Sequence, residues 1–452
     1  MNSVVRPGGW WALFLLGLTY ILNFVDRTIL SAVGEPLRLE FGLSDTQLGL
    51  MGGLAFALTY SVLGVPAAFL SERVPRKVII ASAVMIWSVM TMLCGLATGF
   101  VSLLLLRAGV GVGESGFMPS AHALISDFFP PQRRAFALAL FTTALPIGVL
   151  IAAICGGWLV HNLGWRWTFA VIGAPGLILA PLIWFTLREP ARGEAEGVSA
   201  VNPAMRLSEV LRHLLSRRSA WYLVIGGSLA VVPGYAIFAF GVSYLVRAMG
   251  LGIVAATTIF GVAIAGGQIV GLLAGGRLAE WVGRRYSEGL LIVPAVTLSL
   301  GAIALLATWQ QTEIVPLVIL LTLGITLASA YLAPSYAALH GLMLPHMRAS
   351  GMSIVLLVHA LIGMGLGPPV IGLISDRVAA ASYEGDMAAE CRSEQPGRVE
   401  QSSPSCVRAS AEGLKAALSF AALFSLVAAV QMVLAGRHYR ADINWGKIQC
   451  AT

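Results

Sequence analysis

The chain has 452 residues, of which 57% are hydrophobic and 11% charged, and its mean hydropathy is +0.82. Soluble domains carry about 25% charged residues, so the composition excludes a soluble globular protein and indicates one that crosses a membrane many times. The formal net charge of +7 would indicate nucleic-acid binding in a soluble protein, but here the basic residues lie mostly between apolar runs, where they report orientation and no nucleic-acid partner.

Apolar runs of the length that spans a bilayer recur along the chain. A helix needs about 20 apolar residues to cross about 30 Å of hydrocarbon. We therefore predict an all-α membrane protein with twelve transmembrane helices in two six-helix bundles. The predicted spans are residues 10–33, 47–70, 78–99, 101–125, 135–160, 166–187, 219–247, 252–275, 287–308, 313–340, 350–374 and 412–436.

Two adjacent charges, Asp26 and Arg27, lie inside the first span, and Arg107 and Glu114 lie inside the fourth. Charges at these depths cost about 2.5–3.5 kcal/mol each on insertion scales, and they mark pathways or proton relays. Arg107 and Glu114 are two helical turns apart on nearly one face, whereas Asp26 and Arg27 point about 100° apart and can have different partners.

Two interpretations of these four residues remain open. In the structural one, Asp26 pairs with Arg107 and Arg27 with Glu114, and the pairs only neutralise each other. In the other the network is a switch, because a carboxylate in a low-dielectric cavity takes up a proton when its arginine moves away or binds a substrate anion.

A polar segment, 188–218, separates six spans from six and is partly helical at its end. We therefore expect an N-terminal bundle (1–187), a cytoplasmic linker and a C-terminal bundle (219–452) with a long outer loop at 376–411. With the N-terminus in the cytoplasm, 19 Lys and Arg fall in cytoplasmic segments and 8 in outer loops. The positive-inside rule therefore predicts that both termini are cytoplasmic.

The two halves repeat each other. Pro119-Ser120 matches Pro334-Ser335, and the loop "AFLSERVPRK" (68–77) matches "GRLAEWVGRR" (276–285). Parallel repeats place a substrate cavity between the halves, near the midplane of the membrane.

These two loops resemble the signature loop of the major facilitator superfamily, Gly-x-Leu-Ala-Asp-Arg-x-Gly-Arg-Arg. The second copy fits with Glu280 in place of Asp, and the first departs at Ala68, Glu72 and Pro75. The resemblance implies a cytoplasmic gate that holds the halves together in the outward-open state; the alternative is that the loops only anchor the chain by their charge. The implied gate residues are Glu72, Arg73, Arg76, Lys77, Glu280, Arg284 and Arg285.

Three further motifs, "NFVDRTIL" in the first span, "RAGVGVGESGFMPSAHALISDFFPPQRRA" (107–135) and "GWRWTF" (164–169), together resemble the spinster-type branch of that superfamily. Animal members of the branch export sphingosine 1-phosphate or move lysophospholipids out of lysosomes, and bacterial members exist. The resemblance implies a monomeric, proton-coupled secondary transporter in a bacterial inner membrane. Its substrate would be an anionic amphiphile, lysolipid-like or sphingoid-phosphate-like, moved by alternating access.

Two alternatives stand beside this interpretation. Parts of the motifs recur in superfamily symporters for small organic anions or sugar acids, and a protein of another class, a non-transporting receptor or scaffold, would also have many spans. No enzyme is expected, because the sequence has no nucleotide-binding fingerprint and no nucleophile elbow. We expect no cofactor and no metal, since the five cysteines lack zinc-type spacing.

The candidate site residues follow from the charges and from the family. We assign proton coupling to Asp26 and Glu114. Arginine suits phosphate because its planar fork makes two parallel hydrogen bonds. The substrate-binding candidates are Arg27, Arg107, Tyr20, Phe24, Tyr60, Tyr235, Tyr336 and His359. In the outer loop, Cys391 and Cys406 are disulfide candidates if that loop faces an oxidising compartment.

Overall fold

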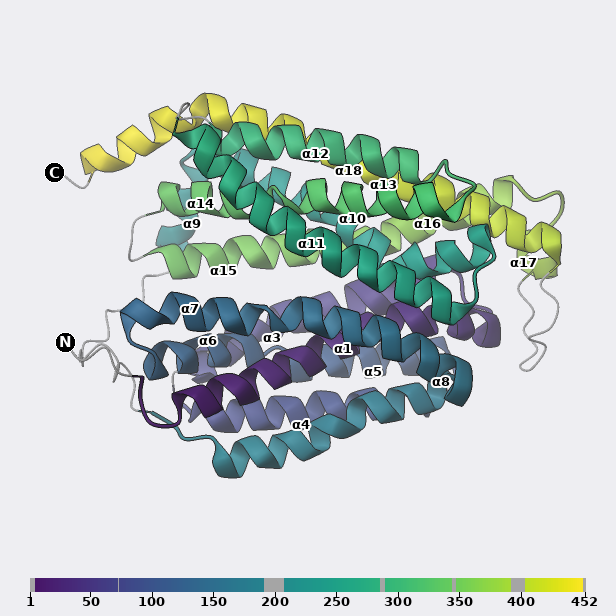
Figure 1. The fold of residues 1–452 in the computed structure, drawn as a ribbon, viewed down its shortest axis with the longest axis horizontal. Coiled ribbons are helices and arrows are strands. Elements are labelled where there is room, and N and C mark those ends of the chain that lie inside the picture. The colour runs from purple at the N-terminus through teal and green to yellow at the C-terminus, as the bar shows by residue number, and fades with distance from the viewer. Residues whose placement is uncertain are drawn as a thin grey trace.

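The structure is a computed structural model that describes residues 5–71, 73–190, 207–284, 289–343, 347–391 and 403–449. In these ranges every regular element is a helix, and the helices form two bundles (Figure 1).

In its described residues the N-terminal bundle, here the N-half, comprises eight α-helices and a π-helix. They are α1 (Gly9–Phe41), α2 (Asp45–Gly49), η1 (Leu50–Leu54), α3 (Ala55–Ser71), α4 (Arg76–Cys94), α5 (Phe100–Glu114), α6 (Phe117–Phe128), α7 (Pro131–Thr142) and α8 (Ala144–Thr186).

The C-terminal bundle, here the C-half, has the same all-helical character. Its elements are α9 (Leu207–Leu215), α10 (Arg218–Met249), α11 (Ile253–Gly283), α12 (Gly289–Thr308), α13 (Ile314–Ser329), α14 (Leu332–Leu342), α15 (Arg348–His359), η3 (Ala360–Leu366), α16 (Gly367–Ala381), α17 (Met387–Cys391) and α18 (Pro404–Gln449).

The long apolar helices are sufficient for twelve membrane crossings. Eleven segments in the described ranges are long and apolar enough to span a membrane, and the longest, Phe136–Thr186, has 51 residues. A straight helix of that length would measure about 75 Å, more than twice the hydrocarbon thickness. The helical path is broken at Gly164, whose φ of +77° favours glycine, so this segment crosses twice. The predicted fold class is confirmed.

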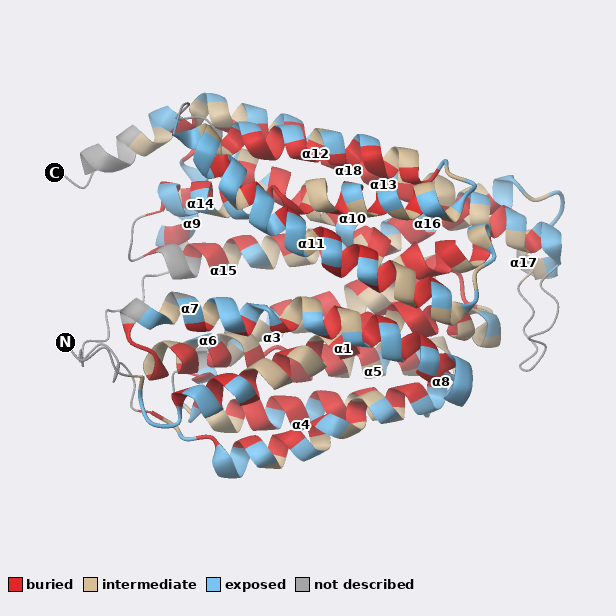
Figure 2. Cartoon of the chain, viewed as in Figure 1, coloured by how far each residue is buried: buried red, intermediate tan, exposed pale blue. Residues whose placement is uncertain are grey.

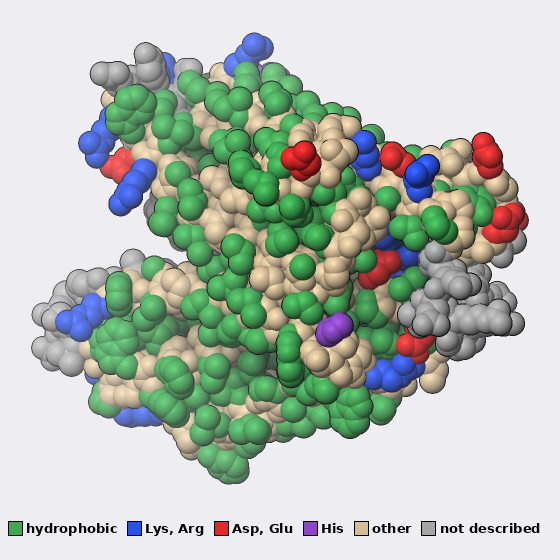
Figure 3. Space-filling model, turned by 45° about the vertical axis from the view of Figure 1, so that its right-hand side comes forward, with side chains coloured by type: hydrophobic (Ala, Val, Ile, Leu, Met, Phe, Trp, Pro, Cys, Tyr) green, Lys and Arg blue, Asp and Glu red, His purple; other side chains and the backbone are tan. Residues whose placement is uncertain are grey.

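The two halves touch at one end and separate at the other. Figure 1 shows both chain termini at the separated end, which we call the termini end, and Figure 3 shows the hollow between the halves there. At the opposite, closed end, α2 packs on α16, η1 on η3 and α8 on α11. The structure is therefore open toward the termini end only.

Glycines allow the close approach at the closed end. A Cβ at Gly49 would lie 2.4 Å from the carbonyl oxygen of Pro368, and one at Gly372 would lie 2.3 Å from that of Asp45. Small residues let helix backbones meet in membrane bundles. Figure 2 shows buried residues where helices face each other and exposed ones on the outer surface, which includes large apolar side chains such as Phe185.

The helices extend beyond the predicted spans. The first runs to Phe41 and not to about residue 33, and α18 covers Pro404–Gln449 and not 412–436. The predicted outer loop at 376–411 consequently contains the end of α16, all of α17 and the start of α18. Hydropathy detects only the apolar part of a helix, whereas backbone hydrogen bonding continues through polar turns outside the hydrocarbon.

The end of the predicted linker is helix α9, and it packs on α10 and α15 of the C-half. Val210 and Leu214 are buried there. Residues 191–206 of the linker lie outside the described ranges.

Candidate functional site

Asp26 of α1 pairs with Arg107 of α5 inside the N-half. Arg107 Nη1 donates to Asp26 Oδ1 at 3.0 Å, and the Thr91 hydroxyl of α4 donates to the other carboxylate oxygen. The two charged side chains are only 2–3% exposed. This pair is sealed inside the bundle, where removal of either partner would leave an uncompensated charge.

The residue after Asp26, Arg27, pairs with Glu114, which lies seven residues after Arg107 on α5. Arg27 Nε lies 2.6 Å from Glu114 Oε2, and the side chain of Glu114 is fully buried while that of Arg27 is 19% exposed. The Arg27 guanidinium also lies 4.7 Å from the Tyr60 ring centroid and 4.8 Å from that of Phe56. Of the four charged side chains, that of Arg27 is therefore the most exposed.

Hydrogen-bonding capacity is left over in this network. Among the described residues, no partner reaches Glu114 Oε1, Arg107 Nε or either side-chain polar atom of Asn23. An unsatisfied buried polar group costs about 1–3 kcal/mol. The free Glu114 oxygen is a position that a proton could occupy.

Glycines of α5, the helix that carries Arg107 and Glu114, let neighbouring helices approach closely. A Cβ at Gly113 would lie 2.6 Å from the backbone nitrogen of Trp87, and one at Gly111 would lie 2.8 Å from the carbonyl oxygen of Phe56. They serve close helix packing, which places α3 and α4 directly against α5.

The aromatic residues predicted to bind substrate lie in both halves, and one of them, Tyr20, is part of the N-half core. Phe24 and Tyr60 of the N-half adjoin Arg27, whose guanidinium lies 5.6 Å from the Phe24 ring centroid. In the C-half, Tyr336 stacks on His359 at 6.2 Å, and Tyr235 is partly buried on α10. Tyr20 is 6% exposed and stacks on Phe141 within that core. Tyr20 therefore packs the bundle.

The predicted gate residues make their contacts within each half. Arg76 binds Asp127 and Glu189, the latter at 2.8 Å, and the backbone of Lys77 also donates to Glu189. Arg284 binds Glu280 one turn away in α11, and Arg73 is exposed. Glu72 and Arg285 lie outside the described residues. A bridge between the halves through these loops in the outward-open state stays a prediction.

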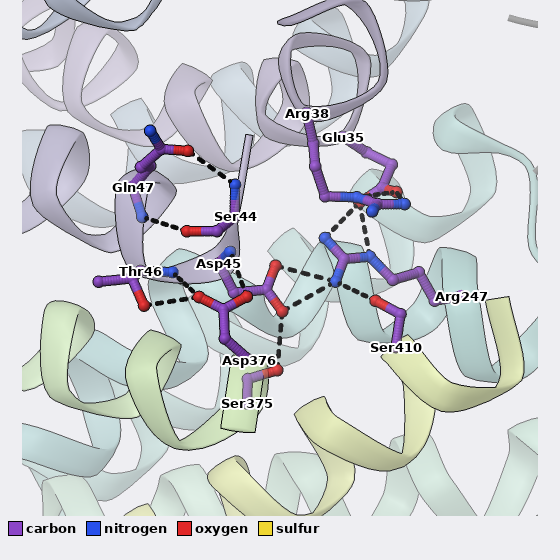
Figure 4. A network of polar contacts seen from close by, with 10 residues as sticks. All are labelled: Glu35, Arg38, Ser44, Asp45, Thr46, Gln47, Arg247, Ser375, Asp376 and Ser410. Atoms are coloured by element: carbon purple, nitrogen blue, oxygen red, sulfur yellow. Dashed lines mark hydrogen bonds and ion pairs between the residues drawn. The ribbon is translucent and has the colours of Figure 1, made fainter. Parts of the chain in front are cut away.

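A second charge network lies at the closed end, and sequence reasoning missed it. Arg247 of α10 donates to Glu35 Oε2 of α1 at 2.8 Å and to Asp45 Oδ1 of α2 at 2.9 Å. It also donates to the Ser410 hydroxyl of α18 at 2.9 Å, and Arg38 holds Glu35 from within α1. Figure 4 shows Arg247 between the two carboxylates. One arginine of the C-half thus binds two acids of the N-half.

The start of α2 adds to this closed-end network. Asp376 of α16 accepts hydrogen bonds from the backbone nitrogens of Asp45 (3.0 Å) and Thr46 (2.9 Å), and Ser375 donates to Asp45 Oδ2 at 2.7 Å. A carboxylate at a helix N-terminus satisfies free amides and favours the helix dipole. The N-cap of α2 is Ser44, which forms a capping box with Gln47. Asp376 adds bonds from the opposite half, so α2 is held to α16 at its first turn.

Residues 16–377 match the Major Facilitator Superfamily. The chain belongs to this superfamily. It is 31% identical over 436 residues to an MFS-type efflux pump of Mycolicibacterium smegmatis, covering 96% of this chain and 94% of that one. Over 192 residues it is 31% identical to a D-galactonate transporter of Escherichia coli, covering 42% of this chain and 44% of the other.

Among solved structures, the chain resembles a bacterial homologue of the human lysosomal transporter spinster, in an inward-facing, unoccupied conformation. The TM-score is 0.84 at 30% identity, and the match covers 97% of this chain and 99% of the other. This superfamily member is therefore spinster-like, an integral membrane transporter and not an enzyme.

The described residues also contain a disulfide bond. Cys391 of α17 and Cys406 of α18 form a disulfide beside the closed end, with their Cα atoms 5.7 Å apart. Both cysteines belong to the C-half.

Proposed function

We propose that the protein is a proton-coupled secondary transporter of an anionic amphiphile. The observation that carries this proposal is the Arg27–Glu114 pair, in which a fully buried acid is neutralised by an arginine that remains partly exposed. An anion that enters between the halves can compete with Glu114 for the guanidinium.

The coupling follows from this competition. When a phosphate or carboxylate takes the donors of Arg27, Glu114 loses its counter-ion while its own side chain is fully buried. An isolated carboxylate is very costly there, so it takes up a proton. The anion and the proton then occupy the site together. When the anion leaves, Arg27 returns to Glu114 and the proton is released. Asp26, sealed with Arg107 and Thr91, would couple through the same arrangement or hold α1 in place.

The walls next to Arg27 favour a substrate with an apolar part. Phe24, Phe56 and Tyr60 surround the guanidinium, and aromatic faces attract cations as well as apolar chains. Tyr235 and Tyr336 supply partly buried rings in the C-half. We propose that the head group binds Arg27 while the tail contacts these rings.

A small sugar acid is the second candidate substrate. The similarity to the D-galactonate transporter over 192 residues supports it, and a single carboxylate could equally occupy Arg27. A receptor or scaffold would bind such anions without moving them.

For the transport cycle, we propose that the termini end faces the cytoplasm of a bacterium and the closed end faces the periplasm. The distribution of Lys and Arg in the sequence supports this orientation. The closed-end network then holds the inward-open state, and the two loops after α3 and α11 replace it in the outward-open state. In this scheme residues 1–187 and 219–452 move as the two bodies and 188–218 links them.

Uptake by proteoliposomes tests the proposal. We expect a proton gradient to drive accumulation of a radiolabelled lysophosphatidate, with excess galactonate competing weakly. Strong competition by galactonate and none by lysolipids would favour the sugar-acid alternative. Binding of either compound with no accumulation would contradict transport.

A further inference from the structure

An apolar groove runs along the outer surface of the N-half, away from the charged site. It has a volume of about 360 Å³ and lies between the first half of α1 and the junction of α7 and α8. Leu13, Gly17 and Ile21 line one side, and Leu140, Ala144 and Ile147 line the other. Leu140 and Ile147 are 46% and 44% exposed, so the groove is open to the lipid.

A basic pocket of about 560 Å³ adjoins the groove at the termini end. Arg6 and Arg133 line it together with the first residues of α1, and Trp10 lines both the pocket and the groove. None of the described residues that line the pocket is acidic, although Arg6 also has a polar or electrostatic partner within the protein. Helix α1 packs on α7 in this part of the N-half.

We propose that the pocket and the groove together bind one anionic phospholipid of the surrounding bilayer. The phosphate interacts with Arg6 and Arg133, whose positive charges complement it, and the start of α1 contributes the favourable end of its dipole. One acyl chain occupies the groove. Basic pockets beside membrane helices are known binding sites for acidic lipid head groups.

The dimensions fit a lipid in one leaflet. From Trp10 to Ile21 the groove follows eleven residue steps of α1, about 16 Å, which is about half of the hydrocarbon thickness. Trp10 and Trp11 are 49% and 43% exposed at the pocket, where tryptophan marks the boundary between head groups and tails. The head-group pocket is therefore at the membrane surface and the groove is at the depth of the tails.

The charge of the head group is the part that can be tested most directly. Native mass spectrometry of the full-length protein would compare phosphatidylglycerol with phosphatidylcholine carrying the same acyl chains. We expect the wild type to retain phosphatidylglycerol in preference. In the Arg6→Gln/Arg133→Gln variant this preference should fall by about 10- to 30-fold, since each basic residue near an anionic lipid contributes about fivefold.

A matched control removes two arginines from the same end of the molecule but from the C-half. The Arg437→Gln/Arg440→Gln variant has the same net charge as the test variant and should keep the preference for phosphatidylglycerol. Equal retention of both lipids by the wild type would overturn the proposal. So would an unchanged preference in Arg6→Gln/Arg133→Gln.

The groove is tested by filling it. A Cβ at Gly17 meets no atom within 4 Å, so Gly17→Phe places a ring in the groove without disturbing the helices behind it. We expect this variant to lose bound phosphatidylglycerol while keeping the melting temperature of the wild type in detergent. Undiminished lipid retention by Gly17→Phe would show that the tail does not lie in the groove and would overturn the assignment.

Discussion

Arg247 Nη1 lies 2.9 Å from Asp45 Oδ1, and this contact joins α10 of the C-half to α2 of the N-half. Arg247 and Asp45 are both buried, and Glu35 completes the site from α1. A buried ion pair is weak evidence for stability by itself, but breaking one strands the remaining charge at a cost of about 3–5 kcal/mol. The halves therefore cannot part at the closed end unless all three groups find water or new partners.

Replacing Arg247 by Gln should shift the protein away from the state described here. Glu35 and Asp45 would then lose the cation that joins them, and their repulsion would favour a closed end filled with water. We expect spin-label distances across the termini end to shorten as the halves close there. Arg38→Gln is the control. Arg38 binds Glu35 from within α1 and does not join the two halves, so this variant should keep the distances of the wild type. If Arg247→Gln shows the same spin-label distances as the wild type, the closed-end network does not hold the two halves together.

Glu114→Gln should separate binding from coupling. The amide mimics the protonated acid and leaves Arg27 in place, so ligand affinity should be kept while proton-driven flux is lost. Asp26→Asn measured in the same liposomes shows which acid carries the proton. Glu40→Gln, which removes an acid bound to Trp165 and Arg166 outside this site, should transport normally. Full pH-dependent flux in both Glu114→Gln and Asp26→Asn would make the two acids structural counter-ions.

Arg27 and Arg107 should respond differently to substitution. Arg27→Gln removes the partly exposed cation. Because a hydrogen bond to a charged group contributes about 1.5–3 kcal/mol, lysophosphatidate affinity should fall about 10- to 100-fold. Arg107→Gln instead leaves Asp26 unpaired in the bundle and should lower the melting temperature. Calorimetric titration and thermal unfolding on both variants distinguish the two roles. An affinity loss in Arg107→Gln without any loss of stability would reverse this assignment.

Two glycines of α5 should differ in their tolerance to alanine. At Gly113 a methyl group meets the backbone of Trp87 at 2.6 Å, whereas at Gly109 it meets the flexible Met90 side chain at 2.8 Å. Overpacking typically costs about 1–3 kcal/mol. We expect Gly113→Ala to lower the melting temperature clearly and Gly109→Ala to lower it little or not at all. Equal melting temperatures would mean that α4 and α5 pack less tightly than described.

The disulfide predicts a count of reactive thiols. The chain has five cysteines, so two in a bond leave three for maleimide in the denatured, unreduced protein and five after reduction. Cys391→Ser should raise the unreduced count to four. Five labels on the unreduced wild type would contradict the bond.

The sequence carried different amounts of information about the two charge networks. Asp26 and Arg107 stand out because they interrupt apolar runs, and seven-residue spacing suffices to put Arg107 and Glu114 on one helix face. Arg247 lies three residues before the glycine that ends α10, where a basic residue ordinarily anchors a span. Its partners Glu35 and Asp45 are at least 202 residues away in sequence, and no local pattern links them.

The fold shows the same division. Span number and bundle size follow from hydropathy, which depends only on the local run of residues in each segment. The extension of α1 to Phe41 runs through polar turns that hydropathy does not detect. The bonds from the amides of α2 to Asp376 join segments at least 330 residues apart, and no local pattern links them.

The bond between Cys391 and Cys406 has a mechanical consequence. Both cysteines belong to the C-half, so the bond stabilises that half and does not connect it to the N-half. If the halves rock as proposed, the bond travels with the C-half and is never stretched by the cycle. Reducing agents would then release α17 from α18 while transport continues, whereas a cross-link from α2 to α16 would stop transport.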